Sequence, residues 1–224
     1  MPDAIHGSTD LSSVPLFPLP NMVLFPRAVV PLHIFGERYR VMTADALAGP
    51  RRIAMAHLKQ GWEKDYYGRP AIDPIVCVGT ILTWESLPGG KYNFLLQGQL
   101  RARVISETAA RPYRIAHLEP LEEITPDEQT LLPFRRRIMA AFDEGSLLAT
   151  VIGRQFRQLL ASALPTADIA DLIAFNFLED DGLKQSLLSE PDVLRRVSQT
   201  VTAFEAIKPA LEVPAFKPQE PNMN

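Results

Sequence analysis

The first half of the chain alternates short apolar runs with prolines and glycines, a pattern that predicts strands and turns. After a polar start, residues 14–35 read VPLFPLPNMVLFPRAVVPLHIF. Because proline cannot donate a hydrogen bond to a sheet, these runs are expected to be edge strands or strand ends. Residues 37–48 instead carry apolar residues at helical spacing, and Gly49-Pro50 follows them as a stop signal. We therefore predict a helix over 37–48.

Further apolar runs predict strands up to about residue 118. The sequence LPGG at 87–90 predicts a hairpin turn, and Gly98 within the following run predicts a bulge or bend. With few helices in this half of the chain, the strands predict a small barrel-like sheet. The predicted strands cover residues 53–58, 75–85, 91–104 and 113–118.

After residue 120 the apolar residues recur at helical spacing. Thr125 is expected to cap a first helix, and Pro133 is expected to interrupt it, so that the next helix begins there. Later stripes end at Pro165 and at residues 180–182, and a last helix opens at 189–192. The fold class is therefore α+β. The predicted regions are a disordered tail over 1–12, a β domain over 13–120, a helical domain over 121–208 and a disordered tail over 209–224.

Composition excludes several classes of protein. Apolar residues make up 46% of the sequence and charged residues 22%, which is typical of a globular protein. The net charge of −3 gives no basic footprint for nucleic acid or acidic lipid. No apolar run reaches the length of about 18 residues that a membrane span needs, and the N-terminus has no signal-peptide pattern. The single cysteine, Cys77, cannot form an internal disulfide, which favours the cytoplasm.

Motifs for catalysis, metals or phosphate are absent from the sequence. Gly89-Gly90-Lys91 lacks the first glycine of a phosphate loop, and the histidines do not form an H-E-x-x-H motif. His33 and Cys77 are interpreted as structural, and residues 179–181 as a solvated turn after a helix. We expect no enzyme activity, no cofactor, no metal and no catalytic residue. Arg135–Arg137 raise the possibility of RNA binding, but adjacent residues point to different sides of a helix.

An aromatic loop is the candidate binding feature. Trp62, Tyr66 and Tyr67 lie in the polar stretch QGWEKDYYGRP between two predicted strands. Aromatic rings in a loop offer a large contact area at little entropic cost, so these three residues are candidates for polypeptide binding. The alternative is that the rings fold back and cover an open end of the barrel, and the two interpretations are compatible.

Many short pieces of the chain follow one another in this order: Pro15–Leu19, Phe25-Pro26, Pro31–Phe35, Arg38–Arg40, Gly79-Thr80, Gly98 with Arg101, and LKQSLLSEPDVLRRVSQTV near the end. In this order they resemble the LON domain family, which includes the N-terminal substrate-binding domain of Lon protease. The resemblance extends over residues 14–204 and departs from the family pattern at Phe35-Gly36-Glu37. It implies a PUA-like β pseudobarrel followed by an α-helical bundle, and a function in selecting polypeptide substrates.

The resemblance favours a stand-alone module that binds unfolded or extended polypeptides and lacks the ATPase and peptidase of Lon. A protease or chaperone is a candidate further partner, no membrane partner is expected, and the oligomeric state stays open. Two other functions remain alternatives: RNA binding, by analogy with PUA-like folds, and small-molecule sensing in an aromatic pocket. A basic surface stripe would favour the first of these, a deep closed aromatic pocket the second, and an open apolar groove polypeptide binding.

Overall fold

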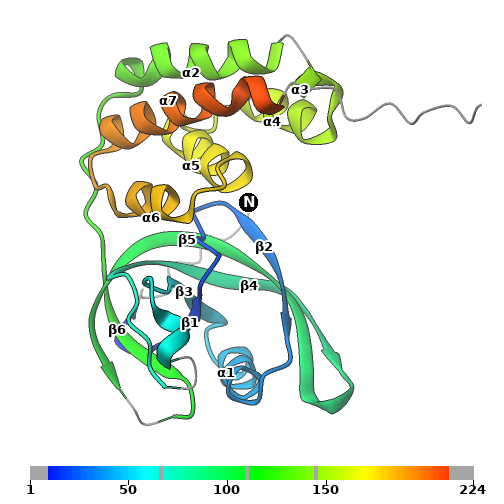
Figure 1. The fold of residues 1–224 in the computed structure, drawn as a ribbon, viewed down its shortest axis with the longest axis vertical. Coiled ribbons are helices and arrows are strands. Elements are labelled where there is room, and N and C mark those ends of the chain that lie inside the picture. Colours follow the sequence, from blue (N-terminus) through cyan, green and yellow to red (C-terminus); the bar gives the residue numbers. More distant parts are fainter. Residues whose placement is uncertain (1–9, 66–67, 109–110, 144–145, 212–224) are drawn as a thin grey trace, which may run out of the picture. The chain divides into compact units, whose positions relative to one another are not determined.

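The computed structural model describes residues 10–65, 68–108, 111–143 and 146–211 (Figure 1). Contacts divide the chain into two compact units. The sheet unit consists of Met1–Glu123 and Glu179–Pro191, and the helical unit consists of Ile124–Leu178 and Asp192–Asn224. The predicted α+β class, with a barrel-like sheet followed by helices, is confirmed.

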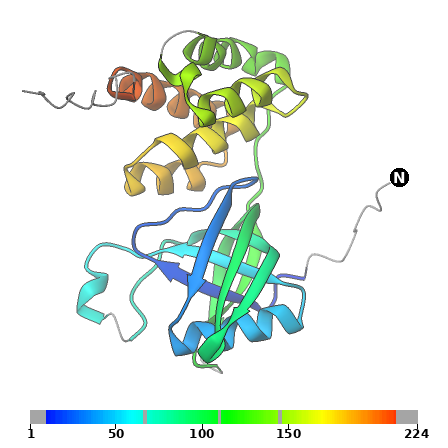
Figure 2. The same cartoon turned by 90° about the vertical axis from the view of Figure 1, so that its right-hand side faces the viewer.

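The described part of the sheet unit contains one sheet of six strands in the order β2-β5-β4-β3-β1-β6. Strand β6 also pairs with β5, so the sheet curves round like a barrel (Figure 2). Buried apolar side chains such as Leu16, Ala54, Val76 and Ala116 fill its interior. The strands are β1 Val14–Leu19, β2 Val29–Ile34, β3 Arg52–His57, β4 Ile75–Leu87, β5 Lys91–Thr108 and β6 Arg114–Pro120.

Strands β4 and β5 form the predicted hairpin. A short 3-10 turn, η2 Pro88–Gly90, joins them, and Gly89 has a φ of 77°, which suits glycine. The pairing places Val78 opposite Leu100 but Gly79 opposite Gly98, so β5 carries an extra residue in a bulge. A Cβ atom at Gly98 would lie 2.1 Å from the carbonyl oxygen of Phe25. The predicted irregularity at Gly98 is therefore confirmed, and the close backbone explains the glycine.

The prolines of the first strands lie where pairing is one-sided. Strand β2, with Pro31, is an edge strand paired only with β5, as predicted. Strand β1 is not an edge strand, because it pairs with both β3 and β6. However, Pro15 lies in its part paired with β6, and Pro18 in its part paired with β3. Each proline nitrogen can thus face the side without a partner strand.

Two helices of the sheet unit pack on its strands. Helix α1 Glu37–Ala48 has the predicted bounds and buries Met42 and Ala46. Helix α6 Asp181–Ser189 is capped by Asp180, whose carboxylate accepts a hydrogen bond of 2.8 Å from the Leu183 amide.

Helix α6 is also hydrogen-bonded to the sheet. The Gln185 side chain donates to the Ile75 carbonyl at 2.9 Å, and Arg101 Nε donates to the Leu188 carbonyl at 3.1 Å. The sequence had assigned this segment to the helical domain. Contacts group it with the sheet, while the boundary at residues 120–121 stays a prediction.

In its described part, the helical unit contains five helices around a phenylalanine core. Phe142, Phe156, Phe177 and Phe204 come from four different helices, with ring centroids 5.1–5.7 Å apart in the pairs that touch. The predicted helical stripes supply these rings. The helices are α2 Glu128–Asp143, α3 Ser146–Ala149, α4 Val151–Ala161, α5 Thr166–Phe177 and α7 Val193–Leu211.

Two predictions about the first helix of this unit are wrong. The cap is Asp127 rather than Thr125, because helix α2 starts at Glu128 and the Asp127 carboxylate accepts from the Gln129 amide at 3.3 Å. Pro133 does not start a new helix, since α2 runs through it. Leu131 and Ile138, on either side of Pro133, are both buried in the same core, and this packing compensates for the one hydrogen bond that proline removes.

Residues at the inner ends of the predicted tails are ordered. Leu11 is buried, and its carbonyl accepts a hydrogen bond of 2.9 Å from the Leu118 amide. Helix α7 continues to Leu211, past the predicted end at residue 208. Residues 1–9 and 212–224, which hold most of both predicted tails, lie outside the described residues.

Candidate functional site

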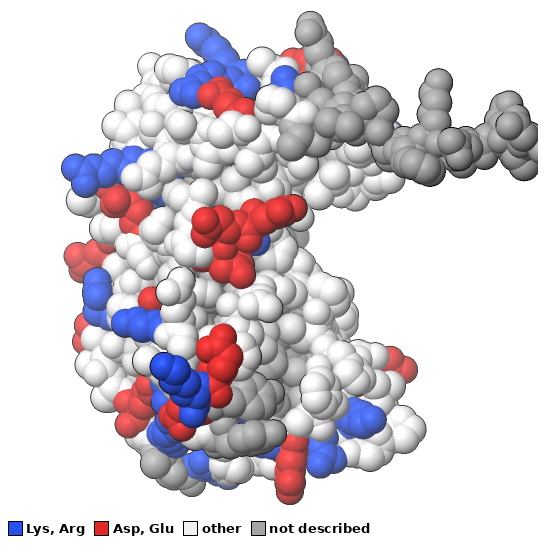
Figure 3. Space-filling model, viewed as in Figure 1, with Lys and Arg blue, Asp and Glu red and all other residues white. Residues whose placement is uncertain are grey.

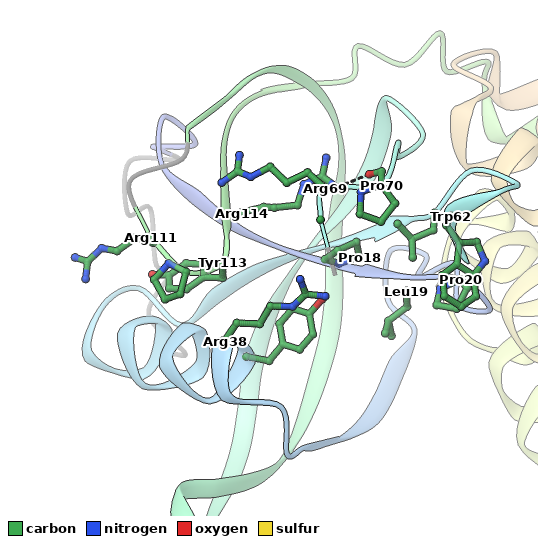
Figure 4. A pocket seen from close by; sticks show the side chains of 14 residues that line it. Pro18, Leu19, Pro20, Arg38, Trp62, Arg69, Pro70, Arg111, Tyr113 and Arg114 are labelled. Atoms are coloured by element: carbon green, nitrogen blue, oxygen red, sulfur yellow. Dashed lines mark hydrogen bonds between the residues drawn. The ribbon is translucent and has the colours of Figure 1, made fainter. Parts of the chain in front are cut away.

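A pocket of about 590 Å³ lies in the sheet unit beside Trp62 (Figure 4). Segments far apart in the sequence build its walls: the end of β1, the first turn of α1, the loop around the 3-10 helix η1 Trp62–Asp65, and the start of β6. Its lining residues are Pro18, Leu19, Pro20, Arg38, Tyr39, Leu58, Trp62, Gly68, Arg69, Pro70, Arg111, Pro112, Tyr113 and Arg114.

Three aromatic rings line the pocket, and contacts with neighbouring residues hold two of them. Tyr39 packs edge-on against Phe17, with ring centroids 4.6 Å apart. Tyr113 donates a hydrogen bond of 2.7 Å to the Asp45 carboxylate. Burial and this carboxylate raise the pKa of Tyr113 to about 12, so its hydroxyl stays protonated at neutral pH. Trp62 is partly exposed and completes the aromatic part of the lining.

Two of the four lining arginines are held by carboxylates. Arg114 makes a two-pronged ion pair with Glu107, at 2.7 and 2.6 Å, and donates to the Pro70 carbonyl at 2.7 Å. Arg111 lies 3.5 Å from Asp45, the same carboxylate that Tyr113 uses. These carboxylates balance the charge of both arginines, and the contacts hold the start of β6 in place.

The other two lining arginines have no carboxylate partner among the described residues. Arg38 lies over the Tyr39 ring, with its guanidinium carbon 4.7 Å from the ring centroid. Among the described residues, the Arg69 guanidinium donates to the Thr108 carbonyl alone, with both terminal nitrogens at 3.3 Å. A guanidinium has five N–H donors, so each retains donors for a ligand. The pocket therefore carries positive charge that the carboxylates of the described residues do not balance.

Of the three predicted binding residues, Trp62 lines the pocket and also a neighbouring hollow near His57 and Gln185. Tyr66 and Tyr67 lie outside the described residues. Their part in binding, and that of Trp62, stays a prediction.

The sequence analysis missed Arg38, Arg69 and Tyr113. No local spacing links these residues, because the fold brings them together from three separate elements. Arg38 does lie in a segment that carries the LON resemblance, and Arg69 lies at the end of the aromatic loop. The sequence therefore marks both segments, but it does not show that they meet in one pocket.

A second surface lies on the outer face of edge strand β2. Leu95 of β5, which pairs with Pro31 of β2, is exposed, and Phe35, directly after β2, is 70% exposed. Leu82 and Trp84 of β4 are also exposed in this part of the sheet. Exposed apolar side chains beside an unpaired edge are typical of a surface that accepts an extended chain, so this surface is the alternative to the pocket.

The residues considered for other chemistry are engaged in the structure. His33 Nδ1 is hydrogen-bonded to Asn93 at 2.7 Å, and Cys77 is fully buried. Arg135 donates to the carbonyls of Leu160, Ser162 and Leu164 at the end of α4, and Arg137 pairs with Glu205.

The described residues form neither a metal site nor a membrane-spanning helix. The part of the chain that the structure describes brings together no group of three or more His, Cys, Asp or Glu able to hold a metal ion. None of its helices is long and apolar enough to cross a membrane.

Comparison with known proteins identifies the family. The family model for the ATP-dependent protease La (LON) substrate-binding domain matches residues 13–203, nearly all of the described chain. The chain belongs to this family. The resemblance inferred from the short sequence motifs is confirmed.

Relatives of known name are full Lon proteases. Lon protease 2 of Sorangium cellulosum is 30% identical over 85% of this chain, and Lon protease 1 of Syntrophobacter fumaroxidans is 28% identical over 94% of it. These matches cover 24% and 25% of the two proteases. The chain thus spans about a quarter of the length of the curated relatives it matches, within the region that corresponds to the LON substrate-binding domain.

Two solved structures share the fold. The N-terminal domain of the Mycobacterium avium complex Lon protease has a TM-score of 0.67 at 15% identity, covering 86% of this chain and 98% of that one. The Lon N-terminal domain protein from Xanthomonas campestris has a TM-score of 0.57 at 21% identity, covering 85% and 97%. At these identities the similarity shows the fold of the LON substrate-binding domain and not its ligand.

Proposed function

We propose that this protein is a polypeptide-binding module that takes up extended or unfolded segments in the pocket beside Trp62 and performs no chemistry on them. Membership of a substrate-binding family supports binding of a protein substrate, and a protease or a chaperone would be the partner that acts on it. The predicted absence of ATPase and peptidase activity belongs to this proposal.

The observation that carries the proposal is the position of Trp62. This ring is partly exposed and lines a pocket whose walls include tyrosines, prolines and leucines as well as arginines. Aromatic rings held in a concave wall are typical of binding anchors, because they contribute a large contact area and lose few rotamers on binding. A volume of about 590 Å³ suits a few side chains of an extended segment.

RNA binding is less well supported. Of the three adjacent arginines, Arg135 binds backbone carbonyls and Arg137 binds a carboxylate. On the face of the molecule in Figure 3, positive and negative residues are interspersed and no continuous basic stripe is seen. A phosphate backbone is usually bound by clustered positive charge on one surface, which this face lacks.

The two tryptophans provide a matched test of where binding occurs. Trp62 lines the proposed pocket, whereas Trp84 is 41% exposed on β4 and belongs to the alternative surface. We expect Trp62→Ala to weaken the binding of unfolded casein by about 2 kcal/mol, or roughly 30-fold, and Trp84→Ala to leave it within about threefold. Titration calorimetry measures the affinity, and thermal melting checks that each variant is folded.

Each other outcome has a distinct meaning. A selective loss in Trp84→Ala would move the site to the β2 surface. A large fall in melting temperature in Trp62→Ala, with affinity unchanged below that temperature, would make the ring a structural cover. Wild-type protein that does not bind casein, or that degrades it, would contradict the proposed function.

A further inference from the structure

We infer that the pocket beside Trp62 recognises the carboxylate of an aspartate or glutamate side chain, through Arg38 and Arg69. This inference rests on the proposed polypeptide binding and adds the class of residue that would be selected. Its starting point is the charge of the pocket wall. Four arginines line the pocket and none of its lining residues is acidic.

The neighbouring carboxylates balance only part of this charge. Glu107 is occupied by Arg114, and Asp45 is shared between Arg111 and Tyr113. The Asp65 carboxylate accepts from the backbone amide of Arg69 at 3.1 Å and makes no ion pair with its guanidinium. Within the described residues, the side-chain charges of Arg38 and Arg69 therefore remain without a counter-charge.

The geometry prepares both guanidinium groups for an anion. The Tyr39 ring beneath Arg38 limits the positions that its side chain can take, and two hydrogen bonds to one carbonyl do the same for Arg69. A guanidinium matches a carboxylate with two parallel N–H···O bonds, and holding it in place lowers the entropy lost on binding. Arg69 is exposed and Arg38 half-buried, so pairing with a ligand requires little desolvation.

Apolar contacts on both sides of these arginines point to a residue inside a chain. In Figure 4, Trp62 and Pro20 lie at one end of the pocket, and Tyr113 lies at the other beside Arg111, whose charge is paired with Asp45. Arg38 and Arg69 lie between the two ends. A side-chain carboxylate between two apolar neighbours would match this order. A terminal carboxylate would leave one of the apolar ends empty.

Fluorescence of Trp62 can report occupancy directly. The protein has two tryptophans, so a Trp84→Phe background leaves Trp62 as the sole emitter. Three peptides of equal length and apolar flanks are titrated into the full chain. The first has a central glutamate and an amidated end, the second has glutamine with the same amidated end, and the third has glutamine with a free C-terminal carboxylate.

We expect the glutamate peptide to bind about tenfold more tightly than either glutamine peptide, because a guanidinium pairs more strongly with an ionised carboxylate than with a neutral amide. Arg38→Gln and Arg69→Gln should each weaken the binding of the glutamate peptide more than that of the glutamine peptides, and so remove most of this preference. Arg103→Gln deletes one exposed positive charge of β5 that lies outside the pocket lining, and it should keep the preference. Raising the salt concentration from about 0.1 M to about 1 M should shrink the preference in the parent protein.

The result that overturns the inference differs from the one that overturns the proposed function. Equal affinity for glutamate and glutamine peptides, or a preference that survives both Arg38→Gln and Arg69→Gln, excludes carboxylate recognition while polypeptide binding stands. Tighter binding of the third peptide alone would show that the site binds a C-terminal carboxylate, and would contradict recognition of an aspartate or glutamate side chain. Failure of all three peptides to bind contradicts the proposed function, and the inference with it.

Discussion

In the helical unit, four phenylalanine rings from four helices pack against one another and are buried, whereas in the sheet unit the partly exposed rings of Tyr39 and Trp62 border an open pocket. The arginines differ in the same way. Arg135 of the helical unit is bonded to three carbonyls, while Arg38 and Arg69 of the sheet unit keep donors for a ligand. Aromatic rings and arginines thus stabilise the fold of the helical unit, whereas in the pocket of the sheet unit they can contact a ligand. Mutations in the two units should therefore separate effects on stability from effects on binding.

The largest expected effect is on the phenylalanine core. Phe142 contacts three other rings and is fully buried, so Phe142→Ala should lower the free energy of unfolding by about 3–5 kcal/mol. Met139→Ala in the same helix is the control, because Met139 is 36% exposed, and it should cost less than about 1 kcal/mol. Urea unfolding followed by circular dichroism measures both. A similar cost for the two variants would contradict the assignment of these rings to a packed core.

A smaller effect is expected in the sheet unit, where backbone packing is tight. A Cβ at Gly98 would meet the Phe25 carbonyl, so Gly98→Ala should cost about 1–3 kcal/mol as the segment between β1 and β2 that holds Phe25 is pushed away from β5. Gly36→Ala is the matched control, because a Cβ at Gly36 would lie 3.5 Å from the Tyr39 ring, an ordinary contact distance. We expect this variant to change the free energy of unfolding by less than about 1 kcal/mol. Unchanged stability in Gly98→Ala would show that the bulge tolerates a side chain.

The smallest effect concerns Tyr113 and depends on pH. Tyr113→Phe removes the hydrogen bond to Asp45 and should cost about 1 kcal/mol at neutral pH. The raised pKa of about 12 means that the folded protein keeps the phenol proton after the unfolded chain, with a pKa near 10, has lost it. The contribution of Tyr113 is therefore full below about pH 10 and is lost as the pH rises towards 12.

Unfolding measurements at about pH 8 and about pH 11 test this prediction. The stability difference between the wild type and Tyr113→Phe should shrink at the higher pH. A difference that stays constant would show that the Tyr113 phenol ionises at its ordinary pKa, and that neither burial nor Asp45 holds its proton.

How well the sequence predicted each feature depends on whether the feature is local. Helix α1, the β4–β5 hairpin and the phenylalanine stripes follow from spacing within one segment, and these predictions are confirmed. Pro133 misled because a local rule treats proline as a break, whereas core packing on both sides keeps α2 continuous. The pocket could be predicted only through Trp62. Its arginines Arg38, in helix α1, and Arg69, in the loop after η1, are brought to one pocket by the fold of distant segments, which no local pattern encodes.

The placement of helix α6 has a consequence for how the protein is made. The segment Glu179–Pro191 belongs to the sheet unit, although the chain between Ile124 and Leu178 belongs to the other one. During synthesis, the Ile75 carbonyl and the Arg101 guanidinium must wait for Gln185 and Leu188 to leave the ribosome before their hydrogen bonds can form. The strands are translated first, yet their unit is completed only after most of the helical unit has been translated.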